Sequence, residues 1–153
     1  MFIKFPQRDL TINLNKVSNI GFLDNKLKIV FNFSHSIDIE KKGTGEWATI
    51  ADYKYIDCAS EEEYSEFKKD VMDSMKTSGN FLMSSDSTHY SVNKSQISYV
   101  TTDSRKNRII FNLSTSITKE THKGINVIND FVFWSFEDPH EFETQYQNIL
   151  NSL

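Results

Sequence analysis

Histidines come first among the residues that could carry chemistry, because they serve as metal ligands or as catalytic bases. A zinc site on one helical face needs two ligands three or four residues apart. No two histidines of this chain have that spacing, so no metal site is predicted from them. The four are His35, His89, His122 and His140.

The possible nucleophiles are equally isolated. His35 lies between Ser34 and Ser36, but Thr115 occupies the matching position of an internal repeat, which argues against a serine–histidine pair. Cys58 has no identifiable base near it in the sequence and is interpreted as a small apolar side chain.

Glycine-rich phosphate loops are also missing. The five glycines, at positions 21, 43, 45, 79 and 124, form neither a Walker pattern nor a dinucleotide-binding pattern. The sequence therefore predicts no cofactor, no catalytic residues and no enzyme activity.

Two groups of acidic residues have structural explanations. Three glutamates, residues 61–63, follow Ser60, whose hydroxyl can accept from the amide of Glu63 while that carboxylate reaches back, as in a capping box. Residues 138–141 (DPHE) predict the same device in the second half. Asp52 and Asp130 hold matching positions, and we expect a turn or an ion pair there.

The organisation of the chain follows from the internal repeat. With an offset of 80 residues, segment 31–37 (FNFSHSI) matches segment 111–117 (FNLSTSI). With an offset of 78, segment 50–56 matches segment 128–134, and both halves end with the same apolar spacing. Self-similarity at this distance predicts a duplicated fold.

Each half has the alternating pattern of strands until its last quarter, where the period becomes helical. In the first half we expect strands at 2–5, 11–14, 17–23, 26–37 and 49–57. Residues 24–25 predict a tight turn, and residues 102–106 a longer one. The expected helical stripes are Tyr64, Phe67, Val71 and Met75, then Phe142, Tyr146, Ile149 and Leu153.

The predicted fold class is α+β, internally duplicated, with two antiparallel β-sheet repeats that are each followed by a C-terminal amphipathic helix. We expect the first repeat at residues 1–76, a linker at 77–80 and the second repeat at 81–153, together forming one compact pseudo-symmetric domain.

Aromatic residues crowd the strand before each helix, and we expect most of them in the core. Trp134 and Phe136 have the opposite parity to Phe131 and Phe133, so the second of these strands is apolar on both faces. It needs a second covering surface, either the other half or another subunit. In the first half the corresponding residues are Tyr53 and Tyr55.

Composition limits the class of protein. The 153 residues include 25% charged residues, five Gly and two Pro, which is typical of a folded globular chain. No apolar run approaches the ~20 residues that span a bilayer, and the first residues do not resemble a signal peptide. With a single cysteine, the chain is expected to be cytoplasmic and not associated with a membrane.

Charge is unevenly distributed along the chain. Residues 60–76 carry −3 and residues 137–153 carry −4, so the remainder carries +3 although the chain totals −4. Acidic helix starts explain this separation, but a mildly basic sheet face with aromatic residues could also stack single-stranded nucleic acid. The candidate contacts are Lys28, Lys94, Arg105, Lys106, Arg108, Lys119 and Lys123.

Two copies of four strands followed by a helix resemble the layout of the whirly family. Its members bind single-stranded DNA or guide RNA at sheet edges and often form rings of four. The lysine-glycine-asparagine-alanine motif of the plant members is absent here, so no functional residue is transferred. Pur-type nucleic-acid binders also have β-rich repeats ending in a helix, with denser basic and aromatic residues.

Two hypotheses for the function remain. In the first, a non-enzymatic protein binds single-stranded DNA or RNA on its mildly basic sheet face. In the second, the chain is a protein–protein interaction or assembly module that uses strand edges or the acidic helix faces, and homo-oligomers are possible.

Overall fold

The computed structural model describes residues 1–40 and 43–153, without the side chains of residues 34–40, 47–52, 115–121 and 126–129. The described residues form two α-helices, ten strands and four short 3-10 turns, and the α+β class predicted from the sequence is confirmed. No helix among the described residues is long and apolar enough to cross a membrane.

The elements of the first half are β1 (Phe2–Phe5), β2 (Leu10–Asn13), β3 (Asn19–Leu23), β4 (Lys28–Glu40), β5 (Trp47–Asp57) and α1 (Glu61–Ser78). Those of the second half are β6 (Phe81–Leu82), β7 (Ser91–Asn93), β8 (Ile97–Asp103), β9 (Arg108–Thr121), β10 (Gly124–Ser135) and α2 (Pro139–Ser152). Helix α1 includes the first two residues of the predicted linker and ends at Ser78, and it is followed by the capping residue Gly79, which has φ 66°.

One eight-stranded sheet runs through both halves, where the sequence predicted a separate sheet in each. Strands β1 and β2 form a small second sheet. Among the described residues, all strand pairs are antiparallel except β4 and β9, whose residues 35–39 and 116–120 pair in parallel. This pairing joins segments about 80 positions apart, and no local sequence pattern indicates it.

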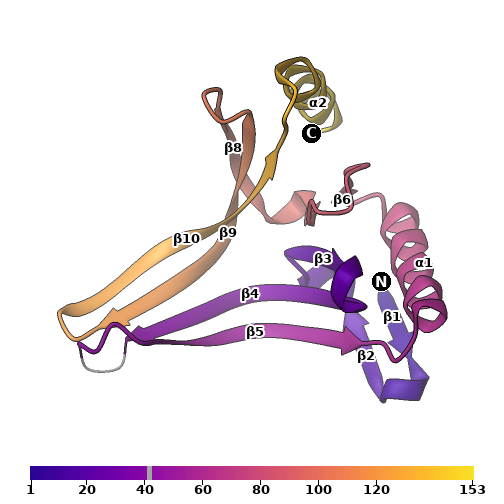
Figure 1. Ribbon diagram of the computed structural model, residues 1–153, viewed down its shortest axis with the longest axis horizontal. Coiled ribbons are helices and arrows are strands. Elements are labelled where there is room, and N and C mark those ends of the chain that lie inside the picture. The colour runs from indigo at the N-terminus through magenta and orange to yellow at the C-terminus, as the bar shows by residue number, and fades with distance from the viewer. Residues whose placement is uncertain (41–42) are drawn as a thin grey trace.

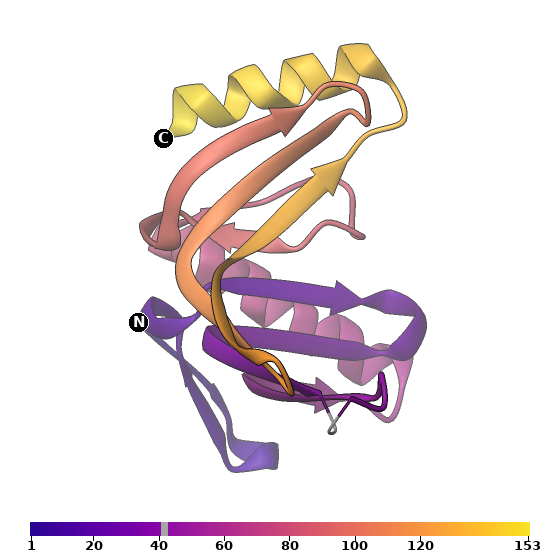
Figure 2. The ribbon, with the colours of Figure 1, turned by 90° about the vertical axis from the view of Figure 1, so that its left-hand side faces the viewer.

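The long strands exchange neighbours near their middles. Strand β4 pairs with β3 through residues 28–32 and with β9 from residue 35 onward, while β9 pairs with β8 up to residue 113. The hairpins β4–β5 and β9–β10 therefore lie together at their tips and diverge away from them (Figure 1). In Figure 2, α2 lies along the top and α1 passes behind the strands of the first half.

Each helix packs most of its predicted stripe against strands of its own half. Tyr64, Phe67, Val71 and Met75 pack in one core cluster with Phe5, Ile29 and Phe31. Phe142 and Ile149 pack in a second cluster with Ile109, Phe111 and Trp134. Tyr146 is only partly buried, and Leu153, after the last helical residue, is 57% exposed, so the stripe prediction fails at that end.

The turns differ from those predicted. Leu23 pairs with Lys28 and Asp103 pairs with Arg108, so the loops 24–27 and 104–107 both have four residues, and the second is not longer. Each loop ends in a left-handed residue, Leu27 with φ 49° and Asn107 with φ 48°. The sequence suggested a two-residue turn at 24–25 because Asp and Asn tolerate left-handed dihedral angles, whereas the left-handed residue of this loop is Leu27.

Both helix caps are present, with differences in detail. The Ser60 hydroxyl accepts from the amide of Glu63 at 3.2 Å, but the Glu63 carboxylate accepts from Ala59 at 2.7 Å instead of from Ser60. Asp138 accepts from the amide of His140 at 3.0 Å, so the second cap is one residue tighter than a capping box.

Candidate functional site

The predicted basic residues do not form one patch. Arg105 and Lys106 lie in the loop before β9, and Arg108 is its first residue. Lys123 lies at the other end of the hairpin, up to about 40 Å along the strand at ~3.3 Å per residue. Lys94 opens a 3-10 turn, Lys28 starts β4, and the side chain of Lys119 lies outside the described residues.

An exposed aromatic surface lies beside the cluster of Arg105, Lys106 and Arg108. The side chains of Tyr99, Phe131 and Phe133 are 51%, 49% and 42% exposed. The expectation that Phe131 and Phe133 lie in the core is therefore wrong. The rings of Phe131 and Phe133 stack at 6.4 Å, and the Arg108 guanidinium lies 4.4 Å from the centre of the Phe133 ring.

Strand register places these side chains on one face. Phe133 and Thr101 both lie opposite Ile110, while Phe131 and Tyr99 both lie opposite Asn112. Because side chains alternate along a strand, Trp134 points to the opposite side, into the core. We call the exposed surface the second-half face; it comprises Tyr99, Thr101, Arg108, Ile110, Asn112, Phe131 and Phe133.

A related but smaller surface exists in the first half. Tyr53 and Tyr55 are 42% and 48% exposed, again contrary to the core prediction, and their rings stack at 5.8 Å. Lys28 Nζ lies 4.4 Å from the centre of the Tyr55 ring. We call this surface, made of Lys28, Val30, Asn32, Tyr53 and Tyr55, the first-half face.

The two faces differ in the pairing of their basic residue and in whether another side chain covers them. Lys28 pairs with Asp57 at 3.3 Å, whereas Arg108 Nε donates to the Ser135 hydroxyl at 3.1 Å and has no ion pair among the described residues. Asp103 lies opposite Arg108 in the register, but its carboxylate accepts from the amide of Arg105.

A tyrosine of the second half, Tyr90, covers part of the first-half face. An ideal Cβ at Gly21 would lie 2.7 Å from two atoms of the Tyr90 ring, so this ring rests directly on the β3 backbone. In β8 the corresponding Thr101 is exposed. The second-half face is therefore open across three strands, and the first-half face is not.

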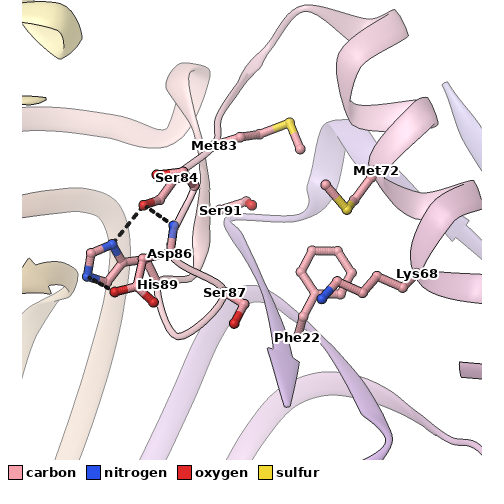
Figure 3. Close-up of a pocket in the computed structure, with 10 residues that line it drawn as sticks. Phe22, Lys68, Met72, Met83, Ser84, Asp86, Ser87, His89 and Ser91 are labelled. Carbon is pink, nitrogen blue, oxygen red and sulfur yellow. Dashed lines mark hydrogen bonds and ion pairs between the residues drawn. The ribbon is translucent and has the colours of Figure 1, made fainter. Parts of the chain in front are cut away.

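A small pocket lies between α1 and the segment that joins β6 to β7. Its volume is about 120 Å³. In Figure 3, Phe22, Lys68 and Met72 lie on one side, and Ser84, Asp86 and His89 lie on the other. Met83, Ser85, Ser87 and Ser91 complete the lining.

Ser84 and His89 are hydrogen-bonded at the wall of this pocket. The distance from Ser84 Oγ to His89 Nδ1 is 2.9 Å, and His89 Nε2 lies 2.9 Å from the backbone oxygen of Ser135. The sequence search tested the serines beside His35 and missed this pair, because a loop rather than adjacency brings the two together. The hydroxyl-rich segment 84–88 (SSDST), directly before His89, was the available signal.

Asp24 connects the pocket to α1. Burial disfavours its ionisation, but hydrogen bonds from Lys68, Tyr64 and Ser87 outweigh this and lower the pKa of Asp24. Tyr64 donates to it at 2.5 Å and Lys68 at 2.8 Å. Burial and the adjacent Asp24 carboxylate raise the pKa of the Tyr64 phenol.

The other groups considered from the sequence have structural surroundings. Burial and the Glu63 carboxylate raise the pKa of the Cys58 thiol, which disfavours the nucleophilic thiolate. The amide of Ala59, with Arg8, lowers the pKa of Glu63. Asp130 lies at a register shift of β10 and accepts from the amide of Phe131, while burial raises its pKa.

Some predictions cannot be placed. The side chains of His35 and Asp52 lie outside the described residues. Within the part of the chain that is described, no three histidine, cysteine or acidic residues are grouped so that they could hold a metal ion.

Comparison with known proteins found no related protein. No family model matches the chain, and no match was found among curated proteins or among solved structures.

Proposed function

We propose that the protein binds single-stranded nucleic acid, without a catalytic step, on the second-half face. The observation that carries this proposal is the exposed pair Phe131 and Phe133 with the Arg108 guanidinium stacked beside it. Aromatic rings stack on unpaired bases of any sequence, at ~1–3 kcal/mol per base. Arg105 and Lys106 in the adjoining loop supply charge for the phosphates.

The choice of this face over the first-half face rests on charge and area. Arg108 has a neutral hydroxyl partner, so its charge is available to a phosphate, whereas Lys28 is paired with Asp57. Tyr99 adds a third exposed ring, while its counterpart Asn19 is buried. The first-half face therefore serves as a matched control within the same chain.

We further propose that the two halves arose by duplication, with the whirly-like layout that the sequence suggested. Asn13 and Asn93 cap the two 3-10 turns that precede β3 and β8. The amide of Cys58 donates to Leu27, and that of Phe136 to Asn107, the residue 80 positions later. These equivalences support a common origin, after which Tyr90 came to cover only the first-half face.

The test is fluorescence anisotropy of labelled oligothymidylate, about 16 nucleotides long, at about 50 and 200 mM salt. Removing both rings in the Phe131→Ala/Phe133→Ala variant should weaken binding by about tenfold or more, since one to two stacked bases are lost. Arg108→Ala should reduce the salt slope by about one. The control Tyr53→Ala/Tyr55→Ala should stay within about twofold of the parent protein, because the proposed site leaves these rings unused.

Two results would contradict the proposal. If the parent protein does not bind at low salt, nucleic-acid binding is wrong. If the two double variants lose affinity equally, binding occurs but the choice of face is wrong.

A protein–protein module remains the second candidate because of the outer strand edges. Strands β5 and β10 each pair along one edge only within the described residues, and Ile125 near the β9–β10 tip is 65% exposed. Unpaired edges are templates for another strand. Concentration-dependent self-association in analytical ultracentrifugation, without a response to the oligonucleotide, would favour this candidate.

A further inference from the structure

The hydrogen bonds around His89 determine which ring nitrogen is basic. A backbone carbonyl can only accept, so the 2.9 Å contact with the Ser135 oxygen requires the proton on Nε2. Nδ1 of the neutral ring then carries a lone pair and accepts from the Ser84 hydroxyl at 2.9 Å. Ser84 thus has the partner that a nucleophilic serine needs, a base oriented by a third group.

The imidazole is held in place by its neighbours. The rings of His89 and Trp134 are stacked at 5.5 Å and 4° from parallel, and Phe136 meets His89 edge-on at 5.1 Å. The indole is itself fixed by a 2.8 Å hydrogen bond to the Tyr90 oxygen. His89 is only 8% exposed, so the base cannot rotate away from Ser84 without disturbing the core.

A carboxylate lies near the ring at a suitable place. Asp86 Oδ2 is 3.7 Å from His89 Nε2. The hydroxyl and the amide of Thr88 lower the pKa of Asp86 and so favour its ionised form. A negative charge here stabilises the imidazolium that forms when the ring takes a proton.

The pocket beside Ser84 limits what could react there. A cavity of roughly 150 Å³ can hold one benzene molecule, so about 120 Å³ accommodates a group of only a few carbon atoms. Phe22, Met72 and Met83 give it an apolar wall. A short acyl chain fits this combination of size and polarity better than a nucleotide or a peptide does.

We propose that Ser84 is a nucleophile with His89 as its general base, and that the pocket takes short-chain acyl esters. Ser84 Oγ forms a bond to the acyl carbon while its proton moves to His89 Nδ1, and the leaving alkoxide departs with that proton as an alcohol. Water then attacks the acyl-serine by the same route, and the carboxylic acid and free Ser84 are released. This activity is independent of the nucleic-acid proposal.

The test is covalent labelling of the full chain with a small alkyl fluorophosphonate, in which serine displaces fluoride from phosphorus. Peptide mass spectrometry should locate the label on Ser84. The Ser84→Ala variant should abolish labelling, and His89→Gln should slow it by about a hundredfold or more, since a positioned base contributes 10²–10⁴. Ser65→Ala, which removes an exposed hydroxyl of α1 outside the pocket lining, should label within about twofold of the parent rate.

A second variant tests the proposal independently in case His89→Gln does not fold. Met72→Trp fills the pocket from α1 and leaves the Ser84 and His89 side chains unchanged, so it should slow labelling by about tenfold while the circular dichroism spectrum is unchanged. An unlabelled parent protein, a label on another residue, or parent rates in both His89→Gln and Met72→Trp would each overturn the proposal. Phe133→Ala should label normally, which separates this activity from oligonucleotide binding.

Discussion

At the residue scale, Asp24 shows how one carboxylate fixes several segments. It lies in the loop between β3 and β4 and accepts from Tyr64 and Lys68 of α1 and from Ser87 of the pocket loop. These bonds favour the ionised form, so the pKa of Asp24 is lower in the folded chain than in the unfolded one. Its contribution to stability is therefore complete above the ordinary value of ~3.9 and is lost as pH falls through the lower folded value.

Replacing this carboxylate should make stability less dependent on pH. Asp24→Asn keeps the shape but removes the charge, so we expect the free energy of unfolding at pH 7 to fall by up to about 1 kcal/mol, a modest value because the pair with Lys68 is partly exposed. In urea unfolding near pH 3, the difference from the parent should shrink. Asp70→Asn on the exposed side of α1 is the control, and a difference of equal size at both pH values would exclude the charge as the cause.

At the element scale, the four-residue loops set the register of the hairpins. Asp9, Leu27 and Asn107 each end such a loop with φ near 47–49°. The left-handed conformation costs most residues about 1–2 kcal/mol, while Asn and Gly tolerate it. Asn107 is thus suited to the left-handed conformation. Leu27 is not, but its side chain packs against the first core cluster, which offsets part of this cost.

A branched residue at position 107 should therefore destabilise the second hairpin. Asn107→Val should lower the free energy of unfolding by about 1–2 kcal/mol, whereas Asn107→Gly should stay within about 0.5 kcal/mol of the parent. Urea unfolding measures both variants, with Ser104→Ala at the first loop position as a neutral reference. Equal losses for Val and Gly would show that side-chain contacts, and not φ, matter at this position.

Elements with a local cause were predictable from the sequence, and those with a distant cause were not. The strands of the first half and both helices follow from periodicity and capping residues close by in the chain. The alternation of side chains along β10 puts Phe131 and Phe133 on one face of the strand and Trp134 on the other. Which of the two faces is buried depends on packing with α2 and β7, and the sequence alone does not indicate this. The prediction that these phenylalanines lie in the core was wrong for this reason. The contact of β4 with β9 and that of Ser84 with His89 also depend on tertiary structure.

At the scale of the whole molecule, the β4–β9 pairing and a few further contacts join two cores that each belong to one half. Strand β3 pairs with β7 at two positions, and the buried Asn93 donates to the Val17 oxygen at 2.8 Å. Tyr90 touches both sides, because its ring covers Gly21 while its backbone oxygen accepts from Trp134. We therefore expect the two halves to unfold together.

The Gly21–Tyr90 contact offers the sharpest test of that coupling. Gly21→Ala places a methyl group against the Tyr90 ring and should cost about 1–3 kcal/mol through overpacking. In a Trp47→Phe background, where Trp134 is the remaining tryptophan, its fluorescence and far-ultraviolet circular dichroism should follow one shared transition. In a Tyr90→Ala background the same substitution should cost less than about 0.5 kcal/mol, since the methyl group then has space. Additive losses, or a Trp134 signal that unfolds separately from the helices, would mean that the halves are stabilised independently and that Tyr90 only covers a surface.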